Sequence, residues 1–361
     1  MAKVKLGDVA REYKATVKDA VDLPVVGLEH LIPGQVELTQ WSEDADNTFT
    51  KGFQKGQMLF GRRRAYLKKA ALAPFDGICS GDITVIEAIP ERIMPELLPF
   101  VIQNDSLFDY AVEKSAGSLS PRVKWEHLKN YEFELPEMEH QRALVDLLWA
   151  MTRTKKAYQE LVKKTDELVK SQFIEMFYGK GYPERRIGDV IDKNIKRVSK
   201  VFDKDDDIQY LDISSIDNVS KVVTSLTPYV LRDAPSRAQY VLEKGDIMYS
   251  TVRPNLQNIS INPYEAGNVV GSTGFCVLRC TGVRTGYMWG VVTGTDFTNS
   301  MIAQASGANY PAVTDKVVHN FMIPIPPLEA QIKFERFVEQ SDKSKFVVKK
   351  NLKTISLIYQ R

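Results

Sequence analysis

Side chains able to bind a polyanion gather in one short stretch of the chain. Residues 61–69, GRRRAYLKK, carry five basic side chains and no acidic one. The formal net charge of +2 hides this local concentration of positive charge. Arginine suits guanine edges and phosphates, so the stretch is a candidate DNA-binding loop. Its candidate residues are Arg62, Arg63, Arg64, Tyr66, Lys68 and Lys69.

A stretch at the matching place in the second half of the chain has a different chemistry. Residues 250–258, STVRPNLQN, replace most of the basic side chains with amides, which suit adenine where arginine suits guanine. The alternative for both stretches is a solvated, charged hairpin that binds nothing. The candidate DNA-contacting residues of the second stretch are Arg253, Asn255, Gln257 and Asn258.

Two further segments could reach the same ligand. Residues 118–123, SLSPRV, and residues 308–313, ANYPAV, occupy matching positions in the two halves. Their side chains could contact DNA or serve as ordinary turn and N-cap residues, and the sequence leaves both interpretations open. The residues concerned are Ser118, Arg122, Asn309 and Tyr310.

No catalytic constellation accompanies these residues. A DNA methyltransferase needs a glycine-rich turn before a helix for the methyl donor, and an amino-methylating one also needs an Asn or Asp, Pro, Pro, aromatic tetrad. NPYE at residues 262–265 has one proline too few, and GNVVGSTG at residues 267–274 leads into a strand-like run. The sequence therefore predicts no catalytic site, no metal site and no cofactor bound by this chain. The histidines lack the spacing of a metal site or a triad: His30, His127, His140 and His319.

Cysteine usage and hydropathy bear on the compartment. Cys79, Cys276 and Cys280 cannot form a disulfide framework and fit packed, reduced thiols. No run of eighteen uncharged apolar residues occurs, and the N-terminal lysines precede no apolar segment. We therefore expect no membrane span, no secretory signal and a cytoplasmic location.

The segments that carry the loops repeat along the chain. The residue numbers of Gly117 and Gly307 differ by 190 (307 − 117 = 190), and several other residue pairs share this offset without a gap. Three blocks recur in the same order at slightly different offsets, which indicates a duplication. They are KLGDVA with RIGDVI, KGQMLFGRRR with KGDIMYSTVR, and SGDITVIE with STGFCVLR. The pairs at the constant offset include Pro121 with Pro311, Val123 with Val313, Asn130 with Asn320, Pro136 with Pro326, Glu139 with Glu329 and Gln141 with Gln331.

Each half is predicted to be an α+β domain followed by a long helix. Short β-like runs bounded by glycine, proline, asparagine and aspartate alternate with a few helical stretches, and 361 residues suit two such domains. At residues 133–141, FELPEMEHQ, and residues 323–331, IPIPPLEAQ, a strand ends in proline and a helix opens. We expect the glutamate and glutamine of each joint to be structural first-turn residues, with direct partner contact as the alternative.

Both long helices have a coiled-coil pattern. Apolar residues recur at spacings near 3.5, and lysines and glutamates occupy the other faces. Two such seams are most simply buried against each other, which predicts an antiparallel pair with one domain at each end. The predicted seam residues are Leu144, Leu147, Met151, Tyr158, Leu161 and Leu168, with Thr154 and Thr165, in the first helix, and Val348, Leu352, Ile355 and Tyr359 in the second.

The order of domain, helix, domain and helix, with the LPEMEHQ and IPPLEAQ joints, resembles the specificity (S) subunits of Type I restriction-modification enzymes over essentially the whole chain. The resemblance implies an α+β fold with two duplicated target recognition domains, separated by two long helices that form an antiparallel coiled coil. Residues 1–137 and 181–327 would be the target recognition domains. Residues 138–180 would form the central helix and residues 328–361 the C-terminal helix.

The same resemblance implies a DNA-binding subunit without catalysis of its own. It would read an asymmetric, bipartite target in double-stranded DNA and direct methylation and restriction by two modification (M) subunits and by restriction (R) subunits. S-adenosylmethionine would bind in the modification subunit. A stand-alone DNA methyltransferase and a coiled-coil adaptor that does not read DNA are the alternatives, and the adaptor leaves the differing basic loops unexplained.

Overall fold

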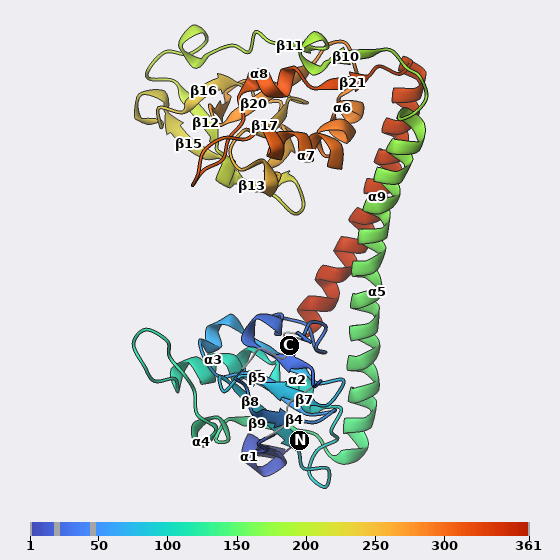
Figure 1. The fold of residues 1–361 in the computed structure, drawn as a ribbon. Coiled ribbons are helices and arrows are strands. Elements are labelled where there is room, and N and C mark those ends of the chain that lie inside the picture. The colour runs from blue at the N-terminus through green and yellow to red at the C-terminus, as the bar shows by residue number, and fades with distance from the viewer. Residues whose placement is uncertain (1, 18–21, 44–47, 360–361) are drawn as a thin grey trace. The chain divides into compact units, whose positions relative to one another are not determined.

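The computed structural model describes residues 2–17, 22–43 and 48–359 of the 361-residue chain and divides it into two compact units. Unit 1 comprises residues 1–160 with 349–361, and unit 2 comprises residues 161–348. Both boundaries fall inside long helices, α5 (Met138–Phe177) and α9 (Leu328–Tyr359), which are labelled in Figure 1. Within the described ranges, no helix combines the length and the apolar character that crossing a membrane requires.

The described residues of unit 1 form three small sheets and a mixed α+β fold. Two are antiparallel, with strand orders β1-β9 and β2-β8-β5-β6, and the third, β3-β7-β4, pairs β3 with β7 in parallel. The strands are β1 (Ala2–Lys5), β2 (Ala10–Glu12), β3 (Val25–Val26), β4 (Lys51–Phe53), β5 (Met58–Gly61), β6 (Ala70–Leu72), β7 (Gly77–Cys79), β8 (Ile83–Ala88) and β9 (Glu132–Leu135).

Short helices cover the four-stranded sheet of unit 1. Phe60 of β5 stacks on Phe108 of α3 with ring centroids 5.5 Å apart, inside a core that also includes α2 residues. The Asn104 side chain caps α3 by accepting a 2.9 Å hydrogen bond from the Ser106 amide, as expected for an N-cap asparagine. The helices are α1 (Leu6–Val9), α2 (Leu98–Ile102), α3 (Asp105–Glu113) and α4 (Trp125–Leu128), with 3-10 turns η1 (Leu28–His30) and η2 (Ala65–Leu67).

Unit 2 is also mixed α+β and has four sheets. Their strand orders are β10-β21, β11-β20-β17-β18, β15-β12-β19-β16 and β13-β14, with β12 and β19 parallel. The strands are β10 (Glu184–Arg186), β11 (Ile191–Asp192), β12 (Asp207–Leu211), β13 (Ile216–Asp217), β14 (Val222–Val223), β15 (Thr227–Val230), β16 (Ala238–Val241), β17 (Ile247–Ser250), β18 (Ile259–Ile261), β19 (Val269–Ser272), β20 (Phe275–Cys280) and β21 (Met322–Pro324).

An aromatic cluster joins the two long helices to the rest of unit 2. Phe173 and Phe177 of α5 pack against Phe334 of α9 and Tyr287 of α6, with ring centroids 4.9–5.6 Å apart. The helices of this unit are α6 (Thr285–Val292), α7 (Thr295–Gln304) and α8 (Asp315–His319), with 3-10 turns η3 (Ile187–Asp189), η4 (Val198–Lys200), η5 (Ile213–Ser215), η6 (Leu231–Asp233) and η7 (Pro254–Leu256).

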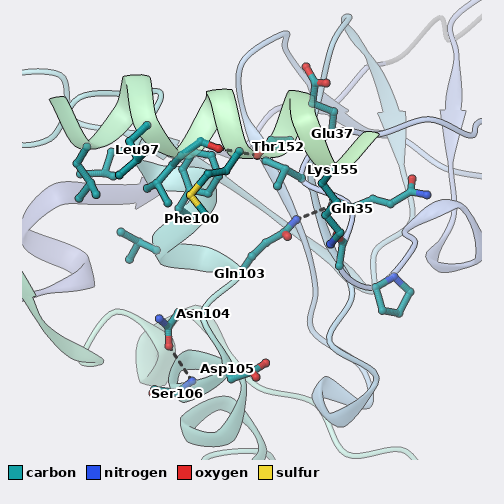
Figure 2. Close-up of a pocket in the computed structure, with 18 of the residues that line it drawn as sticks. Gln35, Glu37, Leu97, Phe100, Gln103, Asn104, Asp105, Ser106, Thr152 and Lys155 are labelled. Carbon is teal, nitrogen blue, oxygen red and sulfur yellow. Dashed lines mark hydrogen bonds between the residues drawn. The ribbon is translucent and has the colours of Figure 1, made fainter. Parts of the chain in front are cut away.

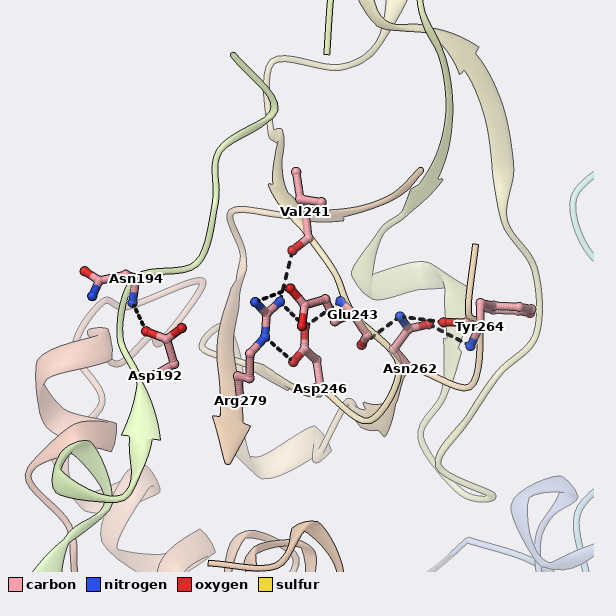
Figure 3. Close-up of polar contacts among 8 residues, drawn as sticks. All are labelled: Asp192, Asn194, Val241, Glu243, Asp246, Asn262, Tyr264 and Arg279. Atoms are coloured by element: carbon pink, nitrogen blue, oxygen red, sulfur yellow. Dashed lines mark hydrogen bonds and ion pairs between the residues drawn. The ribbon is translucent and has the colours of Figure 1, made fainter. Parts of the chain in front are cut away.

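A buried ion pair ties β20 to the turn before β17 (Figure 3). Arg279 donates to Asp246 through Nε at 2.9 Å and Nη2 at 2.8 Å, and through Nη1 to Glu243 at 2.8 Å. In unit 1, Gln57 takes the corresponding place and donates to Glu87 at 3.0 Å. The corresponding turn is therefore held by the Arg279–Asp246 ion pair in unit 2 and by a hydrogen bond from the Gln57 amide to the Glu87 carboxylate in unit 1.

The glutamine of each joint is a buried structural residue. The Gln141 side chain accepts from the Met94 amide at 2.8 Å and donates to the Pro136 carbonyl at 2.9 Å. Gln331 makes the same pair of hydrogen bonds, with the Arg284 amide at 2.8 Å and the Pro326 carbonyl at 2.9 Å. Both glutamines are almost completely buried, at 1% and 2% exposure. Each clasps the start of its long helix to the segment before α2 or α6. The glutamates of the two joints, Glu139 and Glu329, are exposed.

The predicted helix seam needs a correction in unit 2. Leu161 and Leu168 are 48% and 53% exposed, whereas the 3.5-residue spacing predicted them to be in the seam. Val169 packs against the core in place of Leu168, with Phe173 one turn later. A straight α-helix drifts by about 20° per heptad from a 3.5-residue repeat, so the buried face moves by one position along α5. Leu147 in unit 1 is likewise 56% exposed. The side chains of Ile355 and Tyr359 lie outside the described part.

Candidate nucleic-acid interface

The basic loop of unit 1 is held in a tight, unusual backbone conformation. Arg64 and Lys68 have φ values of 53° and 52°, so two non-glycine residues in the left-handed region flank η2. Such residues are costly and persist only where surrounding contacts hold them. Ala65 is buried beneath the turn, while Arg64 and Tyr66 are exposed above it, Tyr66 at 54%.

The second predicted segment of unit 1 lies directly beside this loop. The Arg64 amide donates to the Pro121 carbonyl at 2.8 Å, and the Val123 amide donates to the Arg62 carbonyl at 3.0 Å. Arg122 is fixed from the other side, because its Nε and Nη2 donate to the two Asp82 carboxylate oxygens at 2.6 and 3.1 Å. The hydrogen bond from Arg122 lowers the pKa of the Asp82 carboxyl, so Asp82 is ionised at neutral pH.

Two arginines of this loop have polar atoms that the described residues leave unsatisfied. Arg63 donates through Nη2 to the Ser120 hydroxyl at 3.2 Å and approaches Asp82 at 3.5 Å. Its Nε, like the Nε of Arg62, is buried without a hydrogen-bond partner among the described residues. Buried donors normally find an acceptor, so these two atoms are exceptions within the loop.

Unit 2 repeats the same backbone arrangement at its own pair of loops. Arg253 and Gln257 have φ values of 51° and 49° and flank η7. The Arg253 amide donates to the Pro311 carbonyl at 2.7 Å, and the Val313 amide donates to the Thr251 carbonyl at 2.9 Å. In both units, therefore, the same backbone hydrogen bonds join two segments that are far apart in the sequence.

The side chains on this common backbone differ between the units. In unit 2 the Arg253 guanidinium lies 4.6 Å from the centroid of the Tyr310 ring and donates to the Asn309 carbonyl at 3.2 Å. Tyr310 is 68% exposed, and Asn255 is also exposed. Unit 1 presents arginines at the corresponding surface. At this surface, unit 2 therefore has the ring of Tyr310, the amide of Asn255 and the single arginine Arg253, where unit 1 has a cluster of arginines.

Several predicted contact residues make hydrogen bonds inside their own unit. Lys68 pairs with Asp105 at 2.7 Å, Lys69 donates to the Leu28 carbonyl at 2.6 Å, and Gln257 donates to the Thr298 hydroxyl at 2.8 Å. These contacts brace the loops, and a DNA contact by these side chains stays a prediction. The predicted residues that are exposed are Arg64, Tyr66, Ser118, Arg253, Asn255, Asn309 and Tyr310, and the half-buried ones are Arg62, Arg63, Lys68, Lys69, Arg122, Gln257 and Asn258.

Three residues beside these loops escaped the sequence analysis. Leu119 of the 118–123 segment is 90% exposed, and Asp82 orients Arg122 from a distance of 40 residues. Val219, 88% exposed, lies in a turn whose Asn218 and Lys221 donate to the carbonyls of η7 and Gln257. The polar, turn-forming composition of residues 217–221, DNVSK, could have indicated the turn that carries Val219.

A buried thiol and a histidine of unit 2 lie in contact away from these loops. His319 Nε2 lies 3.4 Å from the Cys276 sulfur, a contact that the sequence did not predict. Burial raises the pKa of the Cys276 thiol well above its ordinary value, so the thiol stays protonated and is a poor nucleophile. Within the described ranges, no three His, Cys, Asp or Glu side chains gather as metal ligands would.

Comparison with known sequences places much of unit 2 in a characterised family. Residues 179–355 match the family model for the Type I restriction modification DNA specificity domain. The Type I restriction enzyme EcoDI specificity subunit of Escherichia coli is 23% identical over 186 residues, which cover 48% of this chain and 40% of the relative. The HindI specificity subunit of Haemophilus influenzae is 28% identical over 107 residues, which cover 28% and 23%. The matches thus span less than half of either relative.

Solved structures extend the likeness to nearly the whole chain at the level of the fold. A chain from a structure concerned with complex assembly and conformational transition of the type I R-M system has a TM-score of 0.58 at 20% identity, covering 99% of this chain and 95% of that one. The S subunit of the Type-I restriction-modification system from M. genitalium has a TM-score of 0.56 at 14% identity, covering 99% and 93%. Residues 179–355 therefore belong to the Type I restriction modification DNA specificity domain family, and the chain as a whole resembles the specificity subunits of Type I restriction enzymes.

Proposed function

We propose that this chain is the DNA-reading specificity subunit of a Type I restriction-modification enzyme. It binds an asymmetric, bipartite target in double-stranded DNA, and each of two duplicated target recognition domains, residues 1–137 and 181–327, reads one half-site. The family match and the fold likeness of nearly the whole chain support this proposal.

The observation that carries the proposal is the pair of loops joined in the same way in each unit. The Arg64 to Pro121 and Arg253 to Pro311 hydrogen bonds hold two otherwise unrelated segments in one surface, at 2.8 and 2.7 Å. An adaptor that bound only proteins would have no need of two such surfaces with different polar side chains. A surface that reads sequence needs a constant frame and variable side chains.

The side chains on the two frames favour different half-sites. Unit 1 offers arginines, of which Arg64 is exposed, and arginine suits guanine edges and phosphates. Unit 2 offers Asn255 and the exposed ring of Tyr310 beside a single arginine. We infer that the two half-sites differ in sequence.

The long helices set the gap between the half-sites in this proposal. The segments 138–180 and 328–361 pair as an antiparallel coiled coil, and the 40 residues of α5 correspond to about 60 Å. Support comes from contacts inside unit 2, where Asp166 pairs with Lys345 at 2.8 Å and Phe173 contacts Phe334. These pairs run in opposite sequence directions, as antiparallel helices require.

The chemistry resides in partner subunits. Two modification (M) subunits, which bind S-adenosylmethionine, methylate the target, and restriction (R) subunits cleave DNA in the full complex. This chain selects the DNA and positions the partners. Purified alone, it should neither transfer a methyl group nor cut DNA, and methylation by the isolated chain would place it among stand-alone methyltransferases.

Half-site mapping tests the proposal directly. The chain is assembled with its modification subunit, and methylated positions are read by sequencing for the wild type, for Arg64→Ala with Tyr66→Ala, and for Asn255→Ala with Tyr310→Ala. Each double variant should relax recognition in one half-site and leave the other half-site unchanged. Simultaneous change of both half-sites, or DNA recognition that ignores both variants, would contradict one reading surface per half-site.

A further inference from the structure

Two arginines lie directly opposite each other in unit 1, one on the basic loop and one on the 118–123 segment. Arg63 and Arg122 form an antiparallel β-bridge, so their side chains leave neighbouring points of the backbone. Like charges at opposite positions of paired strands destabilise the pairing. Asp82, which directly precedes β8, offsets this repulsion because its carboxylate contacts both arginines.

The Asp82 carboxylate clamps one edge of the Arg122 guanidinium. Its two oxygens accept from Nε at 2.6 Å and from Nη2 at 3.1 Å, and such two-bond pairs are strong and fix the orientation of the guanidinium. Arg63 Nη1 lies 3.5 Å from the same carboxylate, and Arg63 Nη2 donates to the Ser120 hydroxyl at 3.2 Å. One carboxylate thus holds both arginines.

The clamp leaves another part of the Arg122 guanidinium able to bind a ligand. A guanidinium carries five N–H donors in one plane, and the clamp uses the edge formed by Nε and Nη2. The end formed by Nη1 and Nη2 faces a different direction. Nη1 makes a long contact of 3.4 Å to the Ser120 carbonyl, and 41% of the Arg122 side chain is exposed. This end suits a ligand with two adjacent acceptors.

Helix α3 braces the basic loop. Lys68 pairs with Asp105 at 2.7 Å, and Asp105 is the first residue of α3. Figure 2 shows Asp105 beside Asn104 and Ser106, whose hydrogen bond caps this helix. Backbone hydrogen bonds of 2.8 and 3.0 Å fix the loop to the 118–123 segment. The opposed arginines therefore stand on a fixed frame, as a precise contact requires.

Unit 2 has neutral side chains where unit 1 has the opposed arginines. Val252 and Ala312 form the antiparallel β-bridge that corresponds to the bridge between Arg63 and Arg122. The same backbone frame is therefore built without these charges, so the arginines are not needed to form it. Their presence in unit 1 calls for a role beyond the frame.

Unit 2 also lacks the carboxylate. The Thr251 amide donates to the Gly274 carbonyl at 3.0 Å. The Arg62 amide makes the same bond with the Asp82 carbonyl at 3.0 Å, so Gly274 occupies the place of Asp82. A Cβ at Gly274 would lie 2.7 Å from Ile213 Cδ1, which shows that an apolar side chain takes this space. The two arginines and the aspartate are present together in one unit and absent together from the other, which favours a joint role.

Phosphate and guanine both accept hydrogen bonds from arginine, and the charge of the pair favours guanine here. The Asp82 carboxylate offsets the charge of Arg122, so the pair gains little from the counterion release that drives phosphate binding. Guanine presents O6 and N7 as two adjacent acceptors in the major groove. An oriented guanidinium end matches these two atoms without needing a net charge.

We propose that Arg122 reads one guanine of the unit 1 half-site through O6 and N7, and that Asp82 is the positioning residue that orients Arg122. This inference rests on the proposed function, because it names the base that one reading residue selects. Unit 2, with Ala312 and Gly274 at the matching places, makes no such contact.

Base analogues test the contact without altering the protein. The target is first read by sequencing DNA methylated by the chain assembled with the proposed modification subunit. Each guanine of both half-sites is then replaced, one at a time, by 7-deazaguanine, which pairs normally but lacks N7. At one guanine this change should weaken wild-type binding on the order of tenfold. Hypoxanthine at the same place keeps O6 and N7 and should change the affinity less.

Variants of the chain identify the side chain responsible. Arg122→Ala should bind the guanine and 7-deazaguanine duplexes with similar affinity. Arg122→Lys keeps the charge but not the two-bond geometry, so it should lose the discrimination as well. Asp82→Asn should reduce the discrimination at that guanine and leave the other base positions unaffected. Glu132→Gln removes an ion pair with Lys3 outside the loops and should behave as the wild type. Circular dichroism checks that each variant is folded.

The outcomes separate this inference from the proposed function. Specific binding with equal 7-deazaguanine sensitivity in the wild type and Arg122→Lys would overturn the guanine contact and leave the specificity-subunit proposal standing. A uniform loss of affinity in Asp82→Asn, with discrimination intact at every base, would reduce the pair to a structural contact and also overturn the inference. Absence of sequence-specific binding by the wild-type assembly would overturn both.

Discussion

The Arg64 amide donates a 2.8 Å hydrogen bond to the carbonyl oxygen of Pro121, which lies far along the sequence. This bond, with its counterpart from Arg253 to Pro311 at 2.7 Å, makes one surface out of two loops in each unit. Because the bonds involve only backbone atoms, side chains on either loop can change while the surface keeps its form.

Removing the arginine cluster of unit 1 should weaken DNA binding and make it less sensitive to salt. Each phosphate that a protein neutralises adds about 0.9 to the steepness of the slope of log affinity against log salt concentration. The triple variant with Arg62→Ala, Arg63→Ala and Arg64→Ala should therefore bind DNA more weakly and show a shallower slope. Gel-shift titrations of the chain assembled with the proposed modification subunit, at several salt concentrations, measure both quantities. A triple variant lacking the exposed Lys3, Lys5 and Lys55 is the control. Equal slopes for the cluster variant and the wild type would reduce the loop to a solvated surface.

Loss of either glutamine clasp should destabilise the chain. Gln141→Ala or Gln331→Ala leaves a buried amide N–H and a proline carbonyl without their partner, which costs about 1–3 kcal/mol. Urea denaturation measures the change. The neighbouring exposed Glu139→Ala and Glu329→Ala should stay within about 0.5 kcal/mol of the wild type. Should the glutamate and glutamine variants lose similar stability, helix-end charge rather than the clasp would be the cause.

The Asp82 contact predicts a defined pH dependence. The Arg122 guanidinium lowers the pKa of Asp82 in the folded chain, so the contact stabilises the fold above the unfolded-state pKa of about 3.9. That contribution disappears as the pH falls below this value through the lower pKa of the folded state. The difference in unfolding free energy between the wild type and Asp82→Asn should therefore be constant from about pH 5 to about pH 8 and shrink below about pH 4. Denaturant titrations across this range test it, and a difference that grows on acidification would contradict the assignment.

The spacer hypothesis makes the most specific prediction. Four residues inserted after Thr165, with four inserted between Asp342 and Lys345 of α9, lengthen both helices by about 6 Å. Half-sites expected about one DNA turn apart should then be separated by about one or two additional base pairs, with both half-site sequences unchanged. Sequencing of methylated sites gives the result, and a four-residue insertion in the exposed turn at Gly267 is the control. Altered half-sites with a constant gap would refute the division into reading domains and spacer.

The sequence alone determined the features that depend on local spacing. The offset between the halves follows from comparing the sequence with itself. The joints and the long helices follow from local patterns: proline before a helix, apolar residues near every third or fourth position, and glycine after the end of the helix. Gly179 and Gly181 after α5 have φ values of 68° and 70°, which other residues rarely adopt. The candidate loops were identifiable for a similar reason, since the charge of the first is concentrated in residues 61–69.

Only the tertiary structure decided which distant groups meet. Asp82 holds Arg122 across 40 residues, and Lys68, Lys69 and Gln257 form hydrogen bonds inside their own unit, which composition does not reveal. The prediction that Leu161 and Leu168 lie in the α5 seam was wrong, because both side chains are exposed. An α-helix has 3.6 rather than 3.5 residues per turn, so the buried face shifts along the helix and packing selects the residues on it. The aromatic cluster of unit 2 depends on side-chain volumes contributed by α5, α6 and α9 at once. Such volumes and long-range pairings follow from the folded packing of the whole unit, and no local pattern encodes them.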